Sequence, residues 1–324
     1  MSFEYQHISV LKQEVLQLLD PRPGENFIDC TLGGGGHAGS ILQATIPDGK
    51  VLAFELDDRA IAASQRKLKK YKDRLIIAHK SYVHLKQELE KHKQELTKIS
   101  GILLDLGISS DQLDRANRGF SFKDHGSLDM RFDKKNQELT ASDIILYWPE
   151  DKLVKIFREY GEVKQPKRLA KGLVLWRQTL VKQKQKMLKT SMLVYVILRI
   201  LNIKPDSVKR FRKHPATQVF QSLRIAVNAE LDNLQSVLPQ AIEVLPKGGR
   251  LAVISFHSLE DRIVKQYFRE LSQACVCPPE NPICNCQQKA QVKLINKRAI
   301  KPSQVEVDDN PRSRSAVLRV VEKL

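Results

Sequence analysis

The stretch from residue 27 to residue 57 constrains the fold of this 324-residue chain more than any other part of it. A short apolar strand ends in Asp29-Cys30-Thr31, four glycines follow from Gly33 to Gly36, and a helix is predicted from about His37 to Ala44. Four glycines allow a sharp turn and a close approach of the main chain to a ligand, because glycine has no Cβ. The free N–H groups at the start of the helix face the same turn.

A second predicted strand, Val51–Phe54, leads directly to Glu55 and Asp57. A carboxylate at the end of this strand is typical of a group that accepts hydrogen bonds from ribose hydroxyls. A flexible surface turn would explain the glycines alone, but not the strand before them, the helix after them and the acid at this distance. The combination predicts a site for a nucleotide or nucleoside cofactor.

The glycine pattern does not choose between cofactors. Gly34, Gly36 and Gly39 match G-x-G-x-x-G, in which a dinucleotide places its pyrophosphate at the helix N-terminus. S-adenosylmethionine has no phosphate and needs mainly close backbone approach and an acid for its ribose. A nicotinamide-dependent oxidoreductase and an enzyme that uses S-adenosylmethionine are both open at this point.

Strands and helices alternate over the first hundred or so residues. Further strands are predicted at 74–78, ending near Tyr82, and at 99–107, which is continuously apolar as a strand buried on both faces should be. This alternation predicts a parallel sheet with right-handed crossovers and with ligands at the carboxyl ends of its strands. The residues at those ends are Asp29, Glu55, Tyr82 and Asp105.

The alternation stops near residue 110. Up to residue 214 only helical stretches follow, such as 141–158 and 167–183, and the α/β pattern resumes with a helix near 218–245 and a strand at 250–256. Residues 291–297 and 316–321 predict a closing hairpin, and Ser258, with Asp261 three residues later, predicts a helix start. We therefore predict a discontinuous α/β core of residues 1–110 and 215–324 with an inserted basic helical domain at 111–214.

The positive charge is concentrated in one segment. The chain has a net charge of +17, and residues 164–213 contain fifteen lysines and arginines against one acid, Asp206, which gives this segment +14. Such a segment attracts phosphate backbones, and although a solvated helix face is the alternative, its position beside a cofactor domain favours nucleic acid. The N-terminus has no signal-peptide pattern and the longest apolar run is too short to span a bilayer, so we expect a soluble, cytoplasmic protein.

Longer sequence strings identify a resemblance over nearly the whole chain. The chain resembles the family of S-adenosylmethionine-dependent methyltransferases that methylate N4 of a cytidine in the decoding region of 16S ribosomal RNA. The strings that carry this resemblance are His7–Leu11, Asp29–His37, Gly101–Ser110, Arg118–Phe122, Leu128–Arg131, His214–Thr217, Ile254–Arg262 and Asn310–Ser315.

The resemblance implies a class I methyltransferase fold, Rossmann-like, with a parallel-type sheet, an antiparallel closing strand and an inserted helical domain. It implies S-adenosylmethionine as cofactor and 16S ribosomal RNA or the small ribosomal subunit as partner; no membrane is implied, and no oligomeric state is assigned. The implied cofactor-binding residues are Gly35, Gly36, His37, Glu55, Tyr82, Asp105 and Gln112. The family often has aspartate at the position of Glu55, so Asp57 is an alternative ribose ligand.

The group that accepts hydrogen bonds from the substrate amine is not assigned by a motif. Other amino methyltransferases have Asn/Asp-Pro-Pro-Tyr/Phe after the fourth strand, where this chain has residues 105–110, Asp-Leu-Gly-Ile-Ser-Ser. The candidates are the backbone of Leu106 and Gly107, and the side chains of Ser109, Asn228 and His257. For His257, a structural hydrogen-bonding role is the alternative.

The candidate RNA contacts are basic side chains, each of which has surface ion pairing as an alternative. They are Arg118, Arg131, Lys182, Lys184, Lys186, Lys189, Arg224 and Arg262. Four of the five cysteines form the pattern C-x-C at 275–277 and again at 284–286. We assign no metal ligands, because C-x-C is tighter than the usual zinc spacing, but Cys275, Cys277, Cys284 and Cys286 leave zinc or reduced thiols open.

Overall fold

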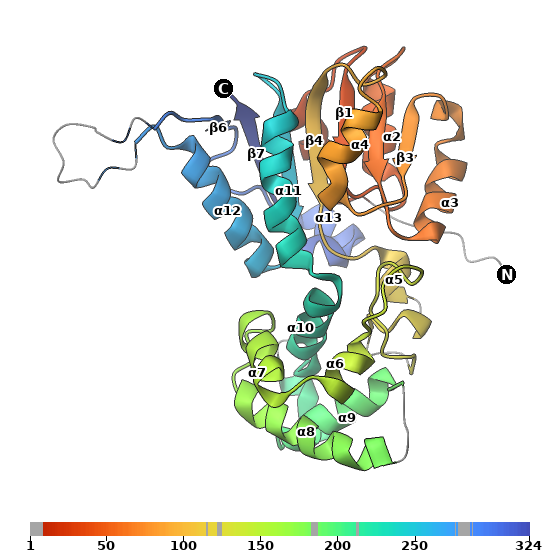
Figure 1. The fold of residues 1–324 in the computed structure, drawn as a ribbon, viewed down its shortest axis with the longest axis vertical. Helices are drawn as coiled ribbons and strands as arrows, with labels where there is room; N and C mark the ends of the chain where they lie inside the picture. Colours follow the sequence, from red (N-terminus) through yellow and green to blue (C-terminus); the bar gives the residue numbers. More distant parts are fainter. Residues whose placement is uncertain are drawn as a thin grey trace. The chain divides into compact units, whose positions relative to one another are not determined.

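A computed structural model describes residues 9–114, 116–121, 125–182, 187–211, 214–275, 277, 286 and 288–324. The chain forms two compact units (Figure 1). The sheet unit consists of Met1–Gly107 and Leu231–Leu324, and the helical unit consists of Ile108–Glu230. His7 and Ile8, the start of the first family-like string, lie outside the described residues.

The sheet unit is built on a seven-stranded sheet in the order β3-β2-β1-β4-β5-β7-β6. The five strands at the β3 side pair in parallel, and β7 pairs antiparallel with both β5 and β6. In that order the strands are Leu75–Ala78, Val51–Phe54, Asn26–Asp29, Ile99–Asp105, Arg250–Ser255, Val317–Lys323 and Val292–Leu294. The predicted class I methyltransferase sheet with its antiparallel closing strand is confirmed.

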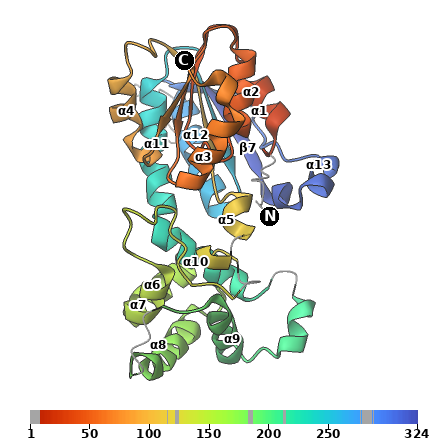
Figure 2. The same ribbon diagram turned by 90° about the vertical axis from the view of Figure 1, so that its right-hand side faces the viewer.

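Helices cover both faces of the sheet, because successive side chains of its buried strands point to opposite faces. Phe27 of β1 packs with α1 (Lys12–Leu19) and α2 (Gly36–Ala44) on one face, whereas Ile28 packs with α11 (Glu230–Val244) and α12 (Ser258–Ser272) on the other. Figure 2 shows α4 and α11 on one side of the sheet and α1 and α2 on the other. The remaining helices of this unit are α3 (Asp58–Lys67), α4 (Leu85–Lys91), α13 (Gln304–Asp309) and the 3-10 helices η1 (Lys69–Tyr71), η2 (Tyr82–His84) and η5 (Pro311–Ser315).

The helical unit has its own hydrophobic core, which includes Phe157, Leu173, Leu193 and Phe220. Phe220 belongs to α10, so residues 216–228 pack in this unit, although the sequence led us to place them in the α/β core. The helices are α5 (Ser110–Asp114), α6 (Ala141–Tyr147), α7 (Glu150–Glu159), α8 (Pro166–Lys182), α9 (Thr190–Ile200), α10 (Ala216–Asn228) and the 3-10 helices η3 (Ala116–Arg118) and η4 (Pro205–Arg210).

Several predicted boundaries differ from the structure for local reasons. The helix predicted over 141–158 is two helices, because Pro149 stops α6 and precedes α7. The helix predicted near 218–245 is divided at Ala229, which has a φ of 48°. Strand β3 ends at Ala78 rather than near Tyr82, because Ser81 caps η2.

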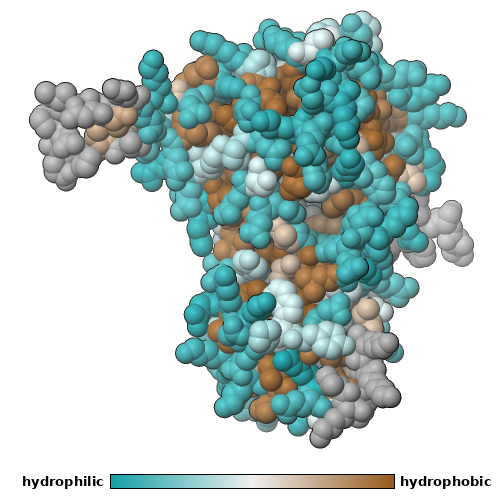
Figure 3. Space-filling model, in the orientation of Figure 1, coloured by the Kyte–Doolittle hydropathy of each residue, from teal (hydrophilic) through white to brown (hydrophobic). Residues whose placement is uncertain are grey.

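Hydrophilic side chains cover most of the face shown in Figure 3. In the described part of the chain, we find no helix with the length and apolar character that crossing a bilayer requires.

Candidate active site

Three acidic residues stand at the carboxyl ends of adjacent strands of the sheet unit. Asp29 ends β1, Glu55 directly follows β2, and Asp105 ends β4. The direction of strand order reverses between β1 and β4, and ligands of open α/β sheets bind at such a switch point. We call these three residues the acidic edge.

Asp29 is the most enclosed member of the acidic edge, with no exposed surface. Its Oδ1 accepts a hydrogen bond from the N–H of Thr31 at 3.0 Å, whereas its buried Oδ2 has no hydrogen-bond partner within the described residues. Burial, together with the nearby charge of Glu55, raises the pKa of Asp29 to about 7. A carboxylate oxygen left in this state is a ready acceptor for a cationic or hydrogen-bond-donating ligand.

Asp105 has a similar environment. Its Oδ1 is also buried, without a hydrogen-bond partner in the part of the chain that is described, and its Oδ2 lies 3.6 Å from Nε2 of His37 at the start of α2. Burial raises the pKa of Asp105 well above its ordinary value, and the charges of Asp29 and Glu260 raise it further.

Glu55 connects the acidic edge to the glycine turn. Its Oε2 accepts the N–H of Gly33 at 2.8 Å, and its Oε1 accepts the N–H groups of Leu56 and Asp57 at 2.8 and 2.9 Å. Burial raises the pKa of Glu55, and these hydrogen bonds partly oppose the shift. The carboxylate of Asp57 caps α3 through the N–H of Arg59, so this alternative ribose ligand already has a structural role.

The glycines of the turn are required by the fold as well as by any ligand. Gly33 and Gly35 have φ values of 49° and 71°, in the left-handed region. A Cβ on Gly35 would lie 2.9 Å from Cδ1 of Leu68, and one on Gly36 would overlap the hydroxyl of Ser9. The sequence pattern led us to assign the space beside these two Cα atoms to a ligand. In the structure, protein side chains fill this space.

No lysine or arginine forms an ion pair with Asp29, Glu55 or Asp105 within the described ranges. The acidic edge thus holds three carboxyl groups with raised pKa values, and no lysine or arginine of the described residues pairs with them. Such a site favours the binding of a positively charged ligand and disfavours the binding of a ligand with a pyrophosphate.

The other predicted cofactor residues are divided between the two units. Tyr82 begins η2 after β3 and is partly buried against the core of the sheet unit. Gln112 lies in α5 of the helical unit, where it is buried and its Oε1 accepts the N–H of Ser109. The hydroxyl oxygen of Ser109 in turn accepts the N–H of Gln112 at 3.2 Å, so both side chains take part in the start of α5.

Asn228 is held by main-chain groups of the helical unit. Its Oδ1 accepts the N–H of Phe132 at 2.9 Å, and its Nδ2 donates to the carbonyls of Met130 and Arg224 at 2.8 and 3.0 Å. This side chain therefore fixes the loop before α6 against the end of α10.

His257 caps α12, a role that the sequence led us to assign to Ser258. Its Nδ1 accepts the N–H of Glu260, and Oε2 of Glu260 accepts the N–H groups of Phe256 and His257. Nε2 of His257 lies 3.2 Å from Oε1 of Glu260. Asp261, which we had paired with Ser258, instead binds Arg319 of β7 through two hydrogen bonds.

Three predicted RNA-binding arginines have partners inside the helical unit. Arg131 binds Asp129 through two hydrogen bonds of 2.8 and 3.0 Å, and Arg224 binds Glu230 through two of 2.8 Å. Arg118 donates to the carbonyls of Arg131 and Phe132. These contacts show what the guanidinium groups stabilise within the protein.

The remaining basic candidates are more accessible where they are described. Arg262 is exposed on α12, and Lys189 is exposed at the start of α9. Lys184, Lys186 and the side chain of Lys182 lie outside the described residues. Other exposed cations of the basic segment are Lys164, Lys167, Arg168, Lys171, Arg199, Lys204, Lys209 and Arg210.

We did not include Asp29 and Glu260 among the predicted site residues. The signal for Asp29 was its position at the end of an apolar strand, the same signal that identified Asp105. The signal for Glu260 was its spacing of three residues from His257, which is the spacing of a capping box.

Comparisons with known proteins identify close relatives over the full length. A model of the MraW methylase family matches residues 4–324. Ribosomal RNA small subunit methyltransferase H of Syntrophotalea carbinolica is 44% identical over 320 residues, covering 99% of this chain and 98% of the relative. The protein of the same name from Heliobacterium mobile is 44% identical over 321 residues, covering 99% and 100%. A solved structure described as a putative rRNA-methylase from Clostridium thermocellum has a TM-score of 0.44 at 10% identity, covering 98% of this chain and 100% of that one.

Proposed function

The chain belongs to the MraW methylase family, and we propose from this that it transfers a methyl group from S-adenosylmethionine to N4 of a specific cytidine in the decoding region of 16S ribosomal RNA. The protein is thus an S-adenosylmethionine-dependent methyltransferase that acts on ribosomal RNA of the small subunit. An enzyme with this substrate works in the cytoplasm, where that RNA lies.

The observation that best supports this cofactor is the acidic edge. S-adenosylmethionine supplies a methyl group on a positively charged sulfonium and also has an ammonium group. We propose that Asp29 and Asp105 face the positively charged end, since each has a buried oxygen with no hydrogen-bond partner in the described structure. Glu55 would accept hydrogen bonds from the ribose, and Tyr82 would lie against the adenine. A nicotinamide dinucleotide would bring its pyrophosphate toward the same buried acids, which is unfavourable.

The remaining predicted cofactor residues have supporting roles in the proposal. Gly35 and Gly36 would shape the turn in which the methionine portion lies, and His37 would orient Asp105. The assignment of Gln112 to the cofactor stays a prediction from the family resemblance. We propose that this unit, through its basic segment, binds 16S ribosomal RNA or the small subunit.

An exocyclic cytosine amine is a weak nucleophile, because its lone pair is delocalised into the ring. A site that accepts its hydrogen bonds and aligns the nitrogen lowers the barrier to methyl transfer. We propose that the carbonyls of Leu106 and Gly107, directly after Asp105, accept these hydrogen bonds. His257 is better suited to capping α12, because its Nδ1 already accepts the N–H of Glu260.

The direct test uses the full-length protein and S-adenosylmethionine labelled in its methyl group. Small subunits from a strain that lacks this methylation are one substrate, and free 16S RNA is the other. We expect label in a single cytidine, which mapping by nuclease digestion and mass spectrometry would identify. If no label entered RNA while the protein still bound it, the chain would instead be an RNA-binding module that keeps a cofactor site.

We expect the affinity for S-adenosylmethionine to rise about tenfold between pH 6 and pH 8, because a bound cation needs Asp29 ionised and its pKa is about 7. In the Asp29→Asn protein the rise should be much smaller.

The raised pKa also affects stability. Asp29 adds to the free energy of unfolding below pH 4, and this stabilisation is lost as the pH rises through 7. Asp29→Asn should therefore stabilise the cofactor-free protein at pH 8. Titration calorimetry and thermal unfolding across this pH range measure both effects, and a flat affinity in the wild type would contradict the assignment.

We expect His257→Asn to retain methyl transfer within about threefold of the wild type, because asparagine is also a good N-cap residue. His257→Ala should lower the free energy of unfolding by about 1 kcal/mol through loss of the cap. Removal of a general base, in contrast, would reduce the rate by about 100-fold or more in both variants. Single-turnover rates and chemical unfolding of the two proteins separate these roles; a 100-fold slower Asn variant that is as stable as the wild type would make His257 the base.

A further inference from the structure

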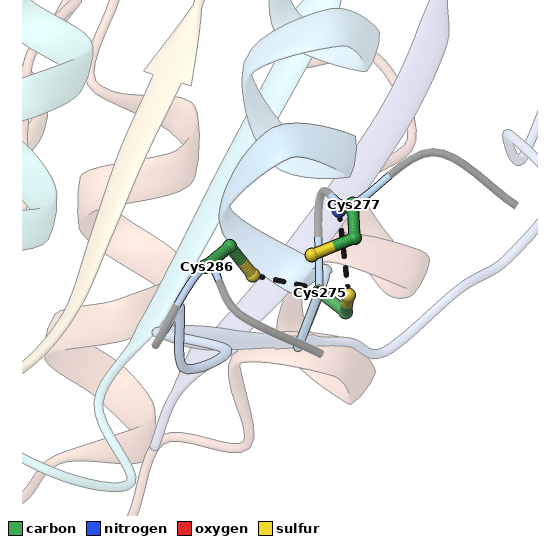
Figure 4. A group of neighbouring side chains, drawn as sticks. All are labelled: Cys275, Cys277 and Cys286. Atoms are coloured by element: carbon green, nitrogen blue, oxygen red, sulfur yellow. Dashed lines mark hydrogen bonds between the residues drawn. The ribbon is translucent and has the colours of Figure 1, made fainter. Parts of the chain in front are cut away.

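Three cysteine thiols converge in the loop that joins α12 to β6. The sulfur atoms of Cys275, Cys277 and Cys286 all lie within 4.8 Å of one another. Figure 4 shows the three sulfur atoms pointing toward a common centre. The Cys286 thiol donates to Sγ of Cys275 at 3.8 Å, and the N–H of Cys277 donates to the same sulfur at 3.4 Å.

The base of this loop is held closed by hydrogen bonds that do not involve the thiols. Nε2 of Gln288 donates to the carbonyls of Gln273 and Glu270 at 3.1 and 3.3 Å, and the N–H of Gln291 donates to the carbonyl of Leu271 at 2.8 Å. Cys275 lies two residues after Gln273, and Cys286 lies two residues before Gln288. The fold of the sheet unit thus already brings the two ends of the loop together, which lowers the entropy cost of forming a site there.

The distances fit a metal better than a disulfide. Zinc–sulfur bonds of about 2.3 Å place the corners of a tetrahedron about 3.8 Å apart, which is the separation of the Cys275 and Cys286 sulfurs. A disulfide needs an S–S distance of about 2.0 Å and only two thiols. We propose that Cys275, Cys277 and Cys286 bind a zinc ion as thiolates, releasing their protons to solvent as the bonds to the metal form.

Three thiolates leave one position of the tetrahedron, for water or a further side chain. The placement of Cys284 is outside the described residues, so the proposed site is defined by the other three cysteines. The ion would join the end of α12 to the start of β6, which is the edge strand of the sheet. Its role would be structural, and it is separate from the methyl-transfer chemistry.

The test is the metal content of the full-length protein, produced without a histidine tag in zinc-supplemented medium and purified under reducing conditions without chelator. We expect about one zinc per chain by elemental mass spectrometry. Cys275→Ser and Cys286→Ser should each reduce this content about tenfold or more, and Cys277→Ser should also reduce it. Cys30→Ala is the matched control, because Cys30 is buried in the sheet core away from the loop, and it should retain the zinc.

Cobalt provides a second measurement on the unaltered protein. Wild-type protein that has been stripped of metal by a chelator and then given Co²⁺ should show the thiolate-to-metal charge-transfer band and the visible bands of a tetrahedral site. Added zinc should displace the cobalt. Thermal unfolding of each variant shows that the sheet unit is folded when its metal is measured. A metal-free wild type with the thiols of Cys275, Cys277 and Cys286 open to alkylation would overturn the proposal, as would a Cys275–Cys286 disulfide seen as a loss of two hydrogens in the intact mass. Zinc lost in Cys284→Ser but kept in Cys277→Ser would overturn the three-thiol set.

Discussion

Replacing Asp105 by asparagine should weaken the binding of S-adenosylmethionine about 100-fold while making the cofactor-free protein more stable at pH 8. Asparagine has nearly the same shape as aspartate, so the packing of β4 is kept. The substitution removes a charge that can balance a bound cation, and the loss of a buried charge-assisted contact typically costs about 2–3 kcal/mol. Within the described residues, no lysine or arginine pairs with Asp105, and Nε2 of His37 lies 3.6 Å from its Oδ2.

The stability change has a sign that follows from the pKa. Because burial raises the pKa of Asp105, the carboxyl favours folding at low pH and this contribution is lost as the pH rises toward its folded pKa. The asparagine variant has no such loss. Asp57→Asn is the control, because Asp57 caps α3 and asparagine caps equally well, so neither affinity nor stability should change by more than a few tenths of a kcal/mol. Calorimetry and chemical unfolding at pH 8 give both numbers; wild-type affinity in Asp105→Asn would remove this residue from the cofactor site.

Neutralising four lysines of the basic segment should weaken RNA binding about 100-fold at 0.15 M salt. The variant is Lys182, Lys184, Lys186 and Lys189 all changed to glutamine. Each phosphate contact contributes about 0.7–0.9 to the slope of log affinity against log salt, so the slope should fall by about 3. The side chain of Lys189 makes no capping hydrogen bond at the start of α9, which indicates that its replacement leaves the helix in place.

The matched control changes four exposed lysines of the sheet unit, Lys72, Lys98, Lys293 and Lys301, to glutamine. This variant loses the same net charge, so it separates a local RNA contact from a general effect of charge. Fluorescence anisotropy with a labelled fragment of 16S RNA at several salt concentrations measures the slopes. Equal slopes in the two variants would mean that the basic segment does not contact RNA.

The sheet was predictable because its signals are local. Apolar strands ending in Asp29 and Asp105, and glycines before a helix, specify strand, turn and helix without knowledge of distant residues. The boundaries of the helical unit were less predictable, since they depend on packing between distant segments. Phe220 of α10 joins the core of that unit, and nothing in the sequence around it shows which of two cores it enters.

The sequence predicted which acids stand at the carboxyl ends of the strands, but not the hydrogen bonds of the candidate site residues. The sequence indicates that acids and arginines are present, but not which hydrogen bonds they already use. Arg224 bound to Glu230, Asn228 bound to three main-chain groups and His257 bound to Glu260 are all outcomes of tertiary structure. Pairing of this kind links residues whose side-chain directions are set only after the helices have packed.

The pairing of β4 with β5 has a consequence for how the protein is made. Gly101 lies opposite Arg250 in this pair, yet the whole helical unit separates them in the sequence. During synthesis β4 leaves the ribosome long before β5. The edge of β4 that pairs with β5 therefore stays unpaired until β5 has been made. The helical unit can fold in the meantime, because its core is built from its own residues. A chain arrested between these two strands would therefore expose an open sheet edge and be prone to aggregate, so the speed of translation through the insertion bears on the yield of active protein.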